Sequence, residues 1–321
     1  MTAAVQAVEL SRSFGDVEAV VGVNLDVAPG ETYGFLGPNG AGKTTCVRML
    51  TTLLRPTGGV ARVAGYDVAS HPAEVRLRIG VALQATAVDP KQTGREFLDL
   101  QGRLYGLSRA ARKTRIAELA DIVDLGEALD RMIRTYSGGM ARRIDLAGAL
   151  VHEPEVVFLD EPTSGLDPAS RLSVWAEIER LNRDEGTTVF LTTQYLEEAD
   201  ALARRIGIID RGLIVTEGTP DELKRAIGSD IVVAEIRGDG PAAERSVAAL
   251  GGVEHAELIG DELIATVADG THAIGTIAVA LHEAGIDVGP LTLRRPTLDD
   301  VFLELTGGHL RVDAETADDA T

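Results

Sequence analysis

Apolar residues recur along this chain in two patterns, one typical of strands and one typical of helices. Short apolar runs that read as buried strands occupy 32–36, 79–83, 156–159 and 187–191. Residues 5–10 and 19–27 instead alternate or cluster apolar side chains around a turn at Phe14-Gly15-Asp16, as in a small antiparallel sheet. Helix-like stretches separate the buried strands, so the pattern predicts an α/β fold with an antiparallel subdomain.

The stretch 95–134 carries apolar residues at spacings of three and four, which is the period of an amphipathic helix. It lies between two strand-like runs, so we expect a helical insertion over about 90–150. Further helices are expected at 141–150 and 169–181, and a hairpin at 206–216.

The order of predicted strands and helices changes after residue 228. Strand-like and helix-like stretches alternate as βαββαβ from 231 to 293, which is the ferredoxin-like arrangement. A last helix is expected from Thr297. The pattern predicts an α/β domain over 1–228, a small α+β accessory domain over 229–306 and a disordered acidic tail over 307–321.

Composition narrows the classes of function. The chain has 321 residues and a formal net charge of -19, which argues against nucleic acid as a partner. Its single cysteine, Cys46, permits no internal disulfide and fits a reducing cytosol. We find no secretory signal and no apolar run long enough to span a bilayer, so a membrane role is expected to need a separate partner.

The buried run 32–36 leads into a glycine-rich segment that a helix-like stretch follows. This segment fits G-x-x-x-x-G-K-[ST] and consists of Gly37, Pro38, Asn39, Gly40, Ala41, Gly42, Lys43, Thr44 and Thr45. Glycines let backbone N–H groups curl around phosphate oxygens at the positive end of the helix. Lys43 adds a point charge for the outer phosphates and Thr44 a hydroxyl for Mg²⁺. The order of strand, loop and helix predicts a nucleoside triphosphate site.

Polar residues end two other buried runs. Asp160 and Glu161 follow 156–159, and ligands of open α/β sheets lie at the carboxyl ends of strands. We therefore expect Asp160 to hold Mg²⁺ through water and Glu161 to act as general base toward an attacking water. The alternative is a pair of solvated acids. Gln84 follows 79–83, where an amide could reach a metal or its water.

Two further features each allow two interpretations. Ser137, Gly138, Gly139 and Met140 open the helix-like stretch 141–150, and this is either a second anion-binding turn or a plain helix cap. Taken alone, the cap is the favoured interpretation. Phe14 either stacks on a nucleotide base or packs into the core as a turn aromatic.

Three motifs together resemble the nucleotide-binding subunit of an ABC transporter: GPNGAGKTT at 37–45, YSGGM at 136–140 and VVFLDEPTSGLDP at 156–168. The resemblance covers about 5–225 and implies an ABC-type P-loop NTPase that binds ATP and Mg²⁺. TTQYLEEAD at 192–200 and RPTLDDVFLELTG at 295–307 look like the drug-exporting, daunorubicin-resistance branch.

The resemblance also implies roles for matching positions. Phe14 would stack on adenine, Gln84 would sense Mg²⁺ and touch the membrane subunit, and Asp167 would link the two sites. Ser137 to Met140 would contact ATP bound to a second copy, with Tyr136 and Met140 departing from the commonest signature. Gln194 stands where the family usually has a histidine, and because glutamine carries no charge near neutral pH, we expect slower hydrolysis.

The implied partners are a second copy of the chain, joined through two ATP molecules, and a separate membrane permease docked near 85–135. This would place the subunit on the inner face of the cell membrane. The alternatives are a soluble ABC ATPase acting on ribosomes or DNA, a P-loop kinase, and a transporter for another cargo such as a lipid, polysaccharide or ion.

Overall fold

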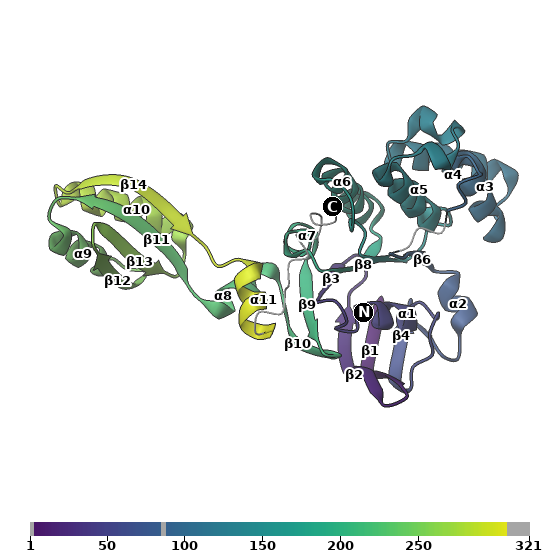
Figure 1. Cartoon of the computed structure of the whole chain (residues 1–321), viewed down its shortest axis with the longest axis horizontal. Coiled ribbons are helices and arrows are strands. Elements are labelled where there is room, and N and C mark those ends of the chain that lie inside the picture. The colour runs from purple at the N-terminus through teal and green to yellow at the C-terminus, as the bar shows by residue number, and fades with distance from the viewer. Residues whose placement is uncertain (1–2, 85–87, 307–321) are drawn as a thin grey trace, which may run out of the picture. The chain divides into compact units, whose positions relative to one another are not determined.

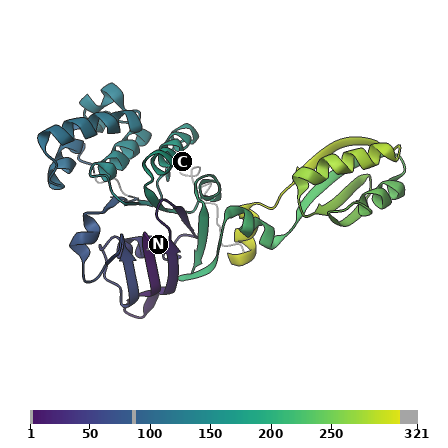
Figure 2. The ribbon, with the colours of Figure 1, turned by 180° about the vertical axis from the view of Figure 1, so that it is seen from behind.

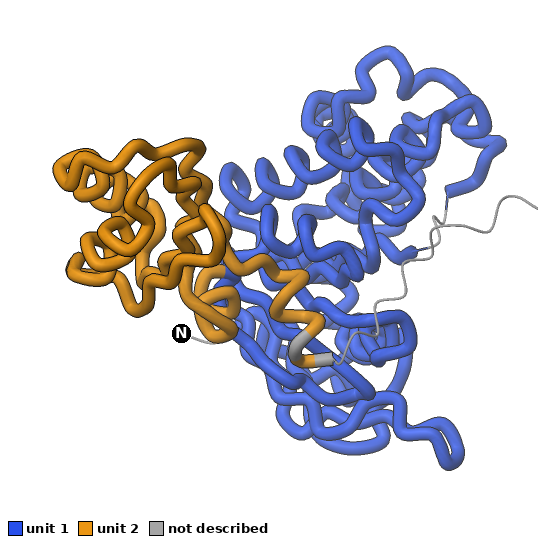
Figure 3. Tube along the Cα trace, turned by 60° about the vertical axis from the view of Figure 1, so that its left-hand side comes forward, with its two compact units in different colours: residues 1–220 blue, residues 221–321 orange. Residues whose placement is uncertain are grey.

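The computed structural model describes residues 3–84 and 88–306. The chain divides into two compact units, 1–220 and 221–321 (Figure 3). The sequence pattern predicts a boundary after 228, whereas this division falls after 220. Helix α8 (Pro220–Ile227) lies between these two positions, so the division assigns nearly all of it to the second unit. The expected acidic tail, 307–321, lies outside the described residues.

A six-stranded sheet forms the centre of the first unit (Figure 1). Its order is β10-β9-β3-β8-β7-β6, and all neighbouring pairs are parallel except β10 with β9 at one edge. The strands are β3 (Thr32–Leu36), β6 (Ile79–Ala82), β7 (Val156–Asp160), β8 (Thr188–Thr193), β9 (Arg205–Asp210) and β10 (Leu213–Gly218). The predicted strands and the predicted hairpin are therefore present.

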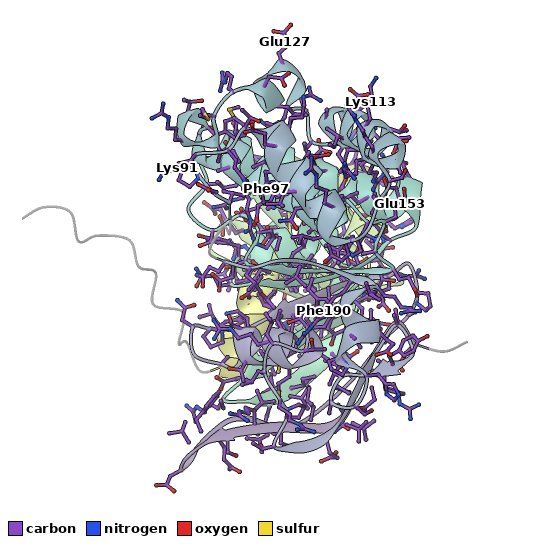
Figure 4. All side chains as sticks on the ribbon, turned by 90° about the vertical axis from the view of Figure 1, so that its right-hand side faces the viewer. Lys91, Phe97, Lys113, Glu127, Glu153 and Phe190 are labelled. Atoms are coloured by element: carbon purple, nitrogen blue, oxygen red, sulfur yellow. The ribbon has the colours of Figure 1, made fainter. Side chains whose placement is uncertain are left out.

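Both faces of this sheet are buried, which explains why its strands read as continuous apolar runs. Along β7, Phe158 belongs to one core cluster, whereas Val157 and Leu159 belong to the other. On the first face Phe190 contacts Tyr33, Phe35 and Phe158, with ring centroids 5.4–5.6 Å apart. Figure 4 shows Phe190 enclosed in this part of the molecule.

A second, antiparallel sheet packs over that first face. Its order is β2-β1-β4-β5, from β1 (Val5–Phe14), β2 (Val17–Val27), β4 (Gly58–Val63) and β5 (Tyr66–Asp67). Phe14 is the last residue of β1 and pairs with Val17, so the turn is shorter than the sequence pattern predicts. Gly15 makes this tight turn possible with a φ of 59°.

The helical insertion lies beyond β6 and shares a hydrophobic core with the second face of the central sheet, and Figure 2 shows it from the other side. It contains α3 (Gly94–Leu104), α4 (Arg109–Ile122), the 3₁₀ turns Gly126–Asp130 and Ile133–Thr135, and α5 (Gly138–Leu150). A capping box between Thr93 and Glu96 starts α3. Phe97 lies among these helices, while Lys91, Lys113 and Glu127 lie at their surface (Figure 4).

Helix α1 (Lys43–Leu50) follows β3, and α6 (Pro168–Glu185) follows β7. Sequence reasoning missed α2 (Pro72–Arg76) and α7 (Leu196–Leu202). These two helices are too short to show a helical period in the sequence.

The second unit contains the predicted βαββαβ order. Its antiparallel sheet has the order β12-β13-β11-β14, and its core lies between the sheet and two helices. The elements are β11 (Asp230–Arg237), α9 (Gly240–Ala248), β12 (Val253–Ile259), β13 (Glu262–Val267), α10 (Gly270–Glu283), β14 (Asp287–Arg294) and α11 (Leu298–Thr306).

Candidate functional site

The glycine-rich loop between β3 and α1 can be built only with glycine at two of its positions. A Cβ on Gly37 would lie 2.4 Å from the carbonyl oxygen of Ile209. A Cβ on Gly42 would lie 2.6 Å from the carbonyl oxygen of Ala19, and its φ is 109°. The loop therefore passes too close to Ile209 and Ala19 for a side chain at either position.

Lys43 is buried at the first position of α1, with 4% of its surface exposed. Its Nζ donates to the carbonyl oxygens of Gly37, at 2.7 Å, and Pro38, at 3.1 Å. It also lies 3.6 Å from Oε1 of Glu161. Burial lowers the pKa of Lys43, and the charges of Glu161 and Asp160 oppose that shift. This ammonium group is thus held at the loop by neighbouring acceptors.

Asp160 ends β7 beside this lysine and is 1% exposed. Its Oδ1 accepts hydrogen bonds from Thr192 Oγ1, at 2.5 Å, and Thr44 Oγ1, at 3.3 Å. Its Oδ2 is buried and accepts no hydrogen bond from the residues that the structure describes. A buried carboxylate oxygen with spare capacity beside a hydroxyl is a donor set suited to Mg²⁺. The residues present therefore fit the expected metal.

Glu161 lies between two polar partners. Its Oε1 faces Lys43, and its Oε2 accepts from Nε2 of Gln84 at 3.1 Å. The backbone φ of Glu161 is 50°, an unusual value for a residue with a side chain. Its backbone N–H donates to the carbonyl oxygen of Thr192 at 3.0 Å. The structure thus brings together Lys43, Thr44, Gln84, Asp160 and Glu161 from three segments of the chain.

The Ser137–Met140 turn belongs to a second cluster. Ser137 caps α5, and its Oγ accepts from the backbone N–H of Met140 at 3.2 Å. Gly139 lies against Ser170, whose Oγ would be 2.6 Å from an added Cβ. Ser170 in turn donates to Asp167, and these hydrogen bonds lower the pKa of Asp167. The turn and Asp167 therefore lie close together. The turn begins α5, which is part of the helical insertion, whereas the glycine-rich loop begins α1, which packs near the antiparallel sheet (Figure 1).

Phe14 and Gln194 complete the predicted set. Phe14 is 48% exposed, with the guanidinium of Arg12 4.5 Å from its ring centroid. The interpretation of Phe14 as a core aromatic is therefore wrong. Gln194 follows β8 two residues after Thr192, which binds Asp160, and it is partly buried.

Sequence reasoning missed three polar residues that support this region. Thr192 bonds Asp160, Arg142 on α5 bonds the loops around Asp160, and Glu198 on α7 accepts from Thr163 and Trp175. Arg142 and Glu198 are 6% and 0% exposed. The signal available for Arg142 and Glu198 was a charged residue on a helix with many apolar neighbours, whereas Thr192 follows the apolar run 187–191.

Comparison with known proteins places this geometry in a family. A model described as ABC transporter matches residues 20–164, and one described as ATP-binding protein DrrA1-3-like, C-terminal domain, matches 218–306. The daunorubicin resistance ATP-binding protein DrrA2 of Streptomyces coeruleorubidus is 48% identical over 308 residues, which cover 95% of each chain. The chain belongs to the ABC transporter ATP-binding proteins. The doxorubicin resistance ATP-binding protein DrrA of Mycobacterium tuberculosis (strain ATCC 25618 / H37Rv) is 45% identical over 95% of this chain and 94% of its own.

Solved structures agree with this assignment. An ATP-binding subunit of an ABC transporter, 28% identical, superimposes with a TM-score of 0.62 over 69% of this chain and 92% of its own. The dimeric structure of MJ0796, a bacterial ABC transporter cassette, has the same fold with a TM-score of 0.62 at 24% identity, over 67% of this chain and 98% of its own.

As an ABC transporter ATP-binding subunit, the chain binds and hydrolyses ATP. The alternative of a P-loop kinase is therefore wrong. Within 3–84 and 88–306, no helix is both long enough and apolar enough to cross a membrane.

Proposed function

We propose that this subunit uses ATP to drive a separate membrane permease that exports a hydrophobic drug or antibiotic. The observation that carries the proposal is the presence of two half-sites in one chain. One is the loop at Gly37–Thr45 with Glu161 beside it, and the other is the Ser137–Met140 turn tied to Asp167. The names of the relatives over almost the whole chain support a drug as cargo.

In the proposed site, the loop N–H groups and Lys43 bind the β- and γ-phosphates, and Phe14 stacks on adenine. Asp160, Thr44 and Gln84 would hold Mg²⁺, which neutralises charge on the phosphate oxygens when bound. Glu161 accepts a proton from the attacking water, and Gln194 donates a hydrogen bond to the γ-phosphate. The ion pair of Lys43 with Glu161 means that phosphate oxygens compete with Glu161 for the ammonium group.

The second half-site suits ATP held by another copy. Ser137 and Gly138 are exposed at the N-terminus of α5, a helix of 13 residues, where backbone N–H groups attract phosphate. Because this turn belongs to the helical insertion and not to the loop before α1, we propose that it covers the ATP of a second copy. Two ATP molecules then join two subunits, and hydrolysis releases them.

A glutamine variant of the general base tests this dimer. Glu161→Gln keeps the size of the side chain but cannot take the proton, so ATP with Mg²⁺ is expected to double the mass measured by light scattering. Lys43→Ala in the same background should stay a single subunit because it loses the phosphate contact. A Glu161→Gln protein that binds ATP yet remains a single subunit at high concentration would contradict the proposal.

An apolar-rimmed groove in the first unit is our proposed docking site for the permease. Its cavity of about 310 Å³ lies between the central sheet and α3, lined by Thr51, Leu53, Arg76, Ile79, Val81, Leu83, Tyr105 and Asp145. Leu53 lines the groove and is 57% exposed, and Leu104, the chain neighbour of the lining residue Tyr105, is 72% exposed. Exposed leucines around a groove are typical of a protein interface. Leu83 also precedes Gln84, so docking could be sensed at Glu161.

Paired substitutions distinguish this groove from the rest of the surface. Leu53→Asp with Leu104→Asp should leave ATP hydrolysis by the isolated subunit within about twofold, since surface changes cost little stability. The variant should fail to co-purify with the permease and should leave the membrane fraction, where we propose that the wild type lies on the inner face. Leu213→Asp, at an equally apolar but distant exposed position, is the control.

The cargo needs a separate experiment. Purified subunit and its permease in proteoliposomes should show ATPase activity stimulated by daunorubicin or doxorubicin. Nod factor export and linearmycin resistance proteins are 36–38% identical to this chain. Stimulation by Nod factor or linearmycin, and by neither daunorubicin nor doxorubicin, would replace drug export of this type with another cargo.

A further inference from the structure

Arg142 lies on α5, the helix that begins with the Ser137–Met140 turn, and its guanidinium is buried among backbone carbonyls. Its Nε donates to the carbonyl oxygen of Pro162 at 2.8 Å. Its Nη1 donates to Leu83 at 2.5 Å, and its Nη2 donates to Asp160 at 3.2 Å. Asp145, one turn later on α5, supplies a carboxylate oxygen 3.2 Å from Nη1. One side chain therefore joins a helix to two separate loops.

Each of these carbonyl groups lies next in the chain to Gln84 or Glu161. Leu83 precedes Gln84, and Pro162 follows Glu161. Gln84 and Glu161 are themselves hydrogen-bonded to each other. The guanidinium thus binds the backbone of both chain segments, while the side chains of Gln84 and Glu161 bind each other.

The backbone at Glu161 needs this support. Its φ of 50° lies in the left-handed region, which residues with a side chain adopt only when their surroundings hold them there. Thr192 accepts from the N–H of Glu161 on one side. Arg142 binds the carbonyl oxygens of Asp160 and Pro162 on the other. The orientation of the general base therefore depends on the position of α5.

We propose that Arg142 is a positioning residue that fixes Glu161 and Gln84 relative to the Ser137–Met140 turn, so that capture of the partner's ATP by the turn sets the geometry of the chain's own general base. This inference rests on the proposed ATP-bridged dimer. A rigid helix with a planar fork at its first turns can transmit a small displacement to both loops.

The variant Arg142→Lys keeps the positive charge and changes the arrangement of the hydrogen-bond donors, so it tests the arrangement alone. A guanidinium spreads five N–H donors over three nitrogens in a fixed plane, and Arg142 uses a different nitrogen for each of the three carbonyls. An ammonium group offers all its donors from one nitrogen, which cannot lie within hydrogen-bond distance of the same three oxygens in this planar arrangement. Arg142 makes none of the described contacts of Lys43 or Thr44, so ATP binding should persist in Arg142→Lys.

The neighbouring Arg143 provides a matched control. It is also largely buried, and its Nη1 donates to the carbonyl oxygens of Val123 and Asp124, both within the helical insertion. Arg143→Lys removes a comparable pair of carbonyl contacts from the same helix without touching the loops at Gln84 and Glu161.

The test measures steady-state ATP hydrolysis by the full chain. For Arg142→Lys we expect kcat to fall by about tenfold or more with KM for ATP changed by less than about threefold, as for loss of transition-state positioning. Arg143→Lys should keep kcat within about twofold of the wild type. Equal kcat values for Arg142→Lys and Arg143→Lys would overturn the proposal.

Two further measurements separate this role from stability and from the dimer. If Arg142→Lys is poorly folded, Arg142→Gln is used, and failure of both to fold while Arg143→Lys folds would assign Arg142 a purely structural role and overturn the proposal. In the Glu161→Gln background, Arg142→Lys should still form the ATP-dependent dimer. Loss of dimerisation by Glu161→Gln itself would refute the proposed function, whereas loss only on adding Arg142→Lys would refute positioning of the general base.

Discussion

The buried carboxyl group of Glu198 is one residue that can make the stability of the fold depend on pH. Its Oε1 accepts from Thr163 at 2.8 Å and from Trp175 at 3.0 Å, and the side chain is fully buried. Burial raises the pKa of Glu198, and hydrogen bonds from Thr193, Thr163 and Trp175 oppose this. Because the folded-state pKa is raised, its contribution to stability is full below the unfolded value and is lost as pH rises through the folded value.

Substitution of Glu198 should separate its charge from its hydrogen bonds. Glu198→Gln keeps an acceptor for Thr163 and Trp175, so its unfolding free energy relative to wild type should rise between pH 5 and pH 8. Glu198→Ala leaves two buried donors unpaired and should cost about 2–4 kcal/mol. Urea unfolding at several pH values measures both, and a Gln variant that loses stability against wild type as pH rises would contradict the assignment.

Gln194 is the residue at which we expect hydrolysis itself to be limited. In the proposed site the glutamine would donate a hydrogen bond to the γ-phosphate, but it cannot carry a positive charge near neutral pH, whereas histidine can. Gln194→His should therefore raise kcat by roughly threefold to tenfold with ATP affinity unchanged. Steady-state ATPase assays give the answer, and a variant no faster than wild type would show that another step limits turnover.

At the scale of elements, α3 and β6 meet through two stacked rings. Tyr105 ends α3, and its ring lies 3.6 Å from that of His152 at an interplanar angle of 2°. A ring nitrogen of His152, Nε2, lies 3.0 Å from the carbonyl oxygen of Ile79 in β6. Burial lowers the pKa of His152 from 6.5 to about 4. This junction, which borders the proposed permease groove, therefore contains a neutral imidazole at physiological pH.

Acid should weaken this junction. Since the folded-state pKa of His152 is depressed, its stabilising contribution is present above pH 6.5 and is lost as pH falls toward 4. His152→Phe keeps the stacking but cannot be protonated. Its unfolding free energy should fall less between pH 7 and pH 5 than that of the wild type, by up to about 2 kcal/mol. Identical pH dependence of the two proteins in urea titrations would rule out this role for His152.

At the scale of the whole molecule, the chain combines an ATPase unit with an accessory unit that has a hydrophobic core of its own. We propose that the accessory unit regulates or stabilises the ATP-bridged dimer. Because the cores are separate, removal of 230–321 should leave the first unit folded.

Deletion of 230–321 from Glu161→Gln should weaken ATP-dependent dimerisation by about tenfold in Kd, which corresponds to about 1.4 kcal/mol. Analytical ultracentrifugation at several concentrations measures this change, and drug transport with the permease is measured in parallel. Unchanged dimerisation, transport and thermal stability of the truncated chain would eliminate the proposed role.

Much of this fold was predictable because its signals are local in the chain. A strand buried on both faces reads as an apolar run, and the loop at Gly37–Thr45 must contain glycine where its backbone passes close to Ile209 and Ala19. The βαββαβ order of the second unit was likewise present in the sequence. Short helices such as α7 were missed because one or two turns show no period.

The sequence by itself determined the phosphate loop, the acids that end β7 and the order of elements, since each depends on neighbours in the chain. Only the tertiary structure decided which groups meet across it. Arg142 bonds the carbonyl oxygens of the residues on either side of Glu161 because α5 packs against β6, and no spacing in the sequence encodes those contacts. Buried polar groups must find partners wherever the fold brings them, so these partners become visible only in three dimensions.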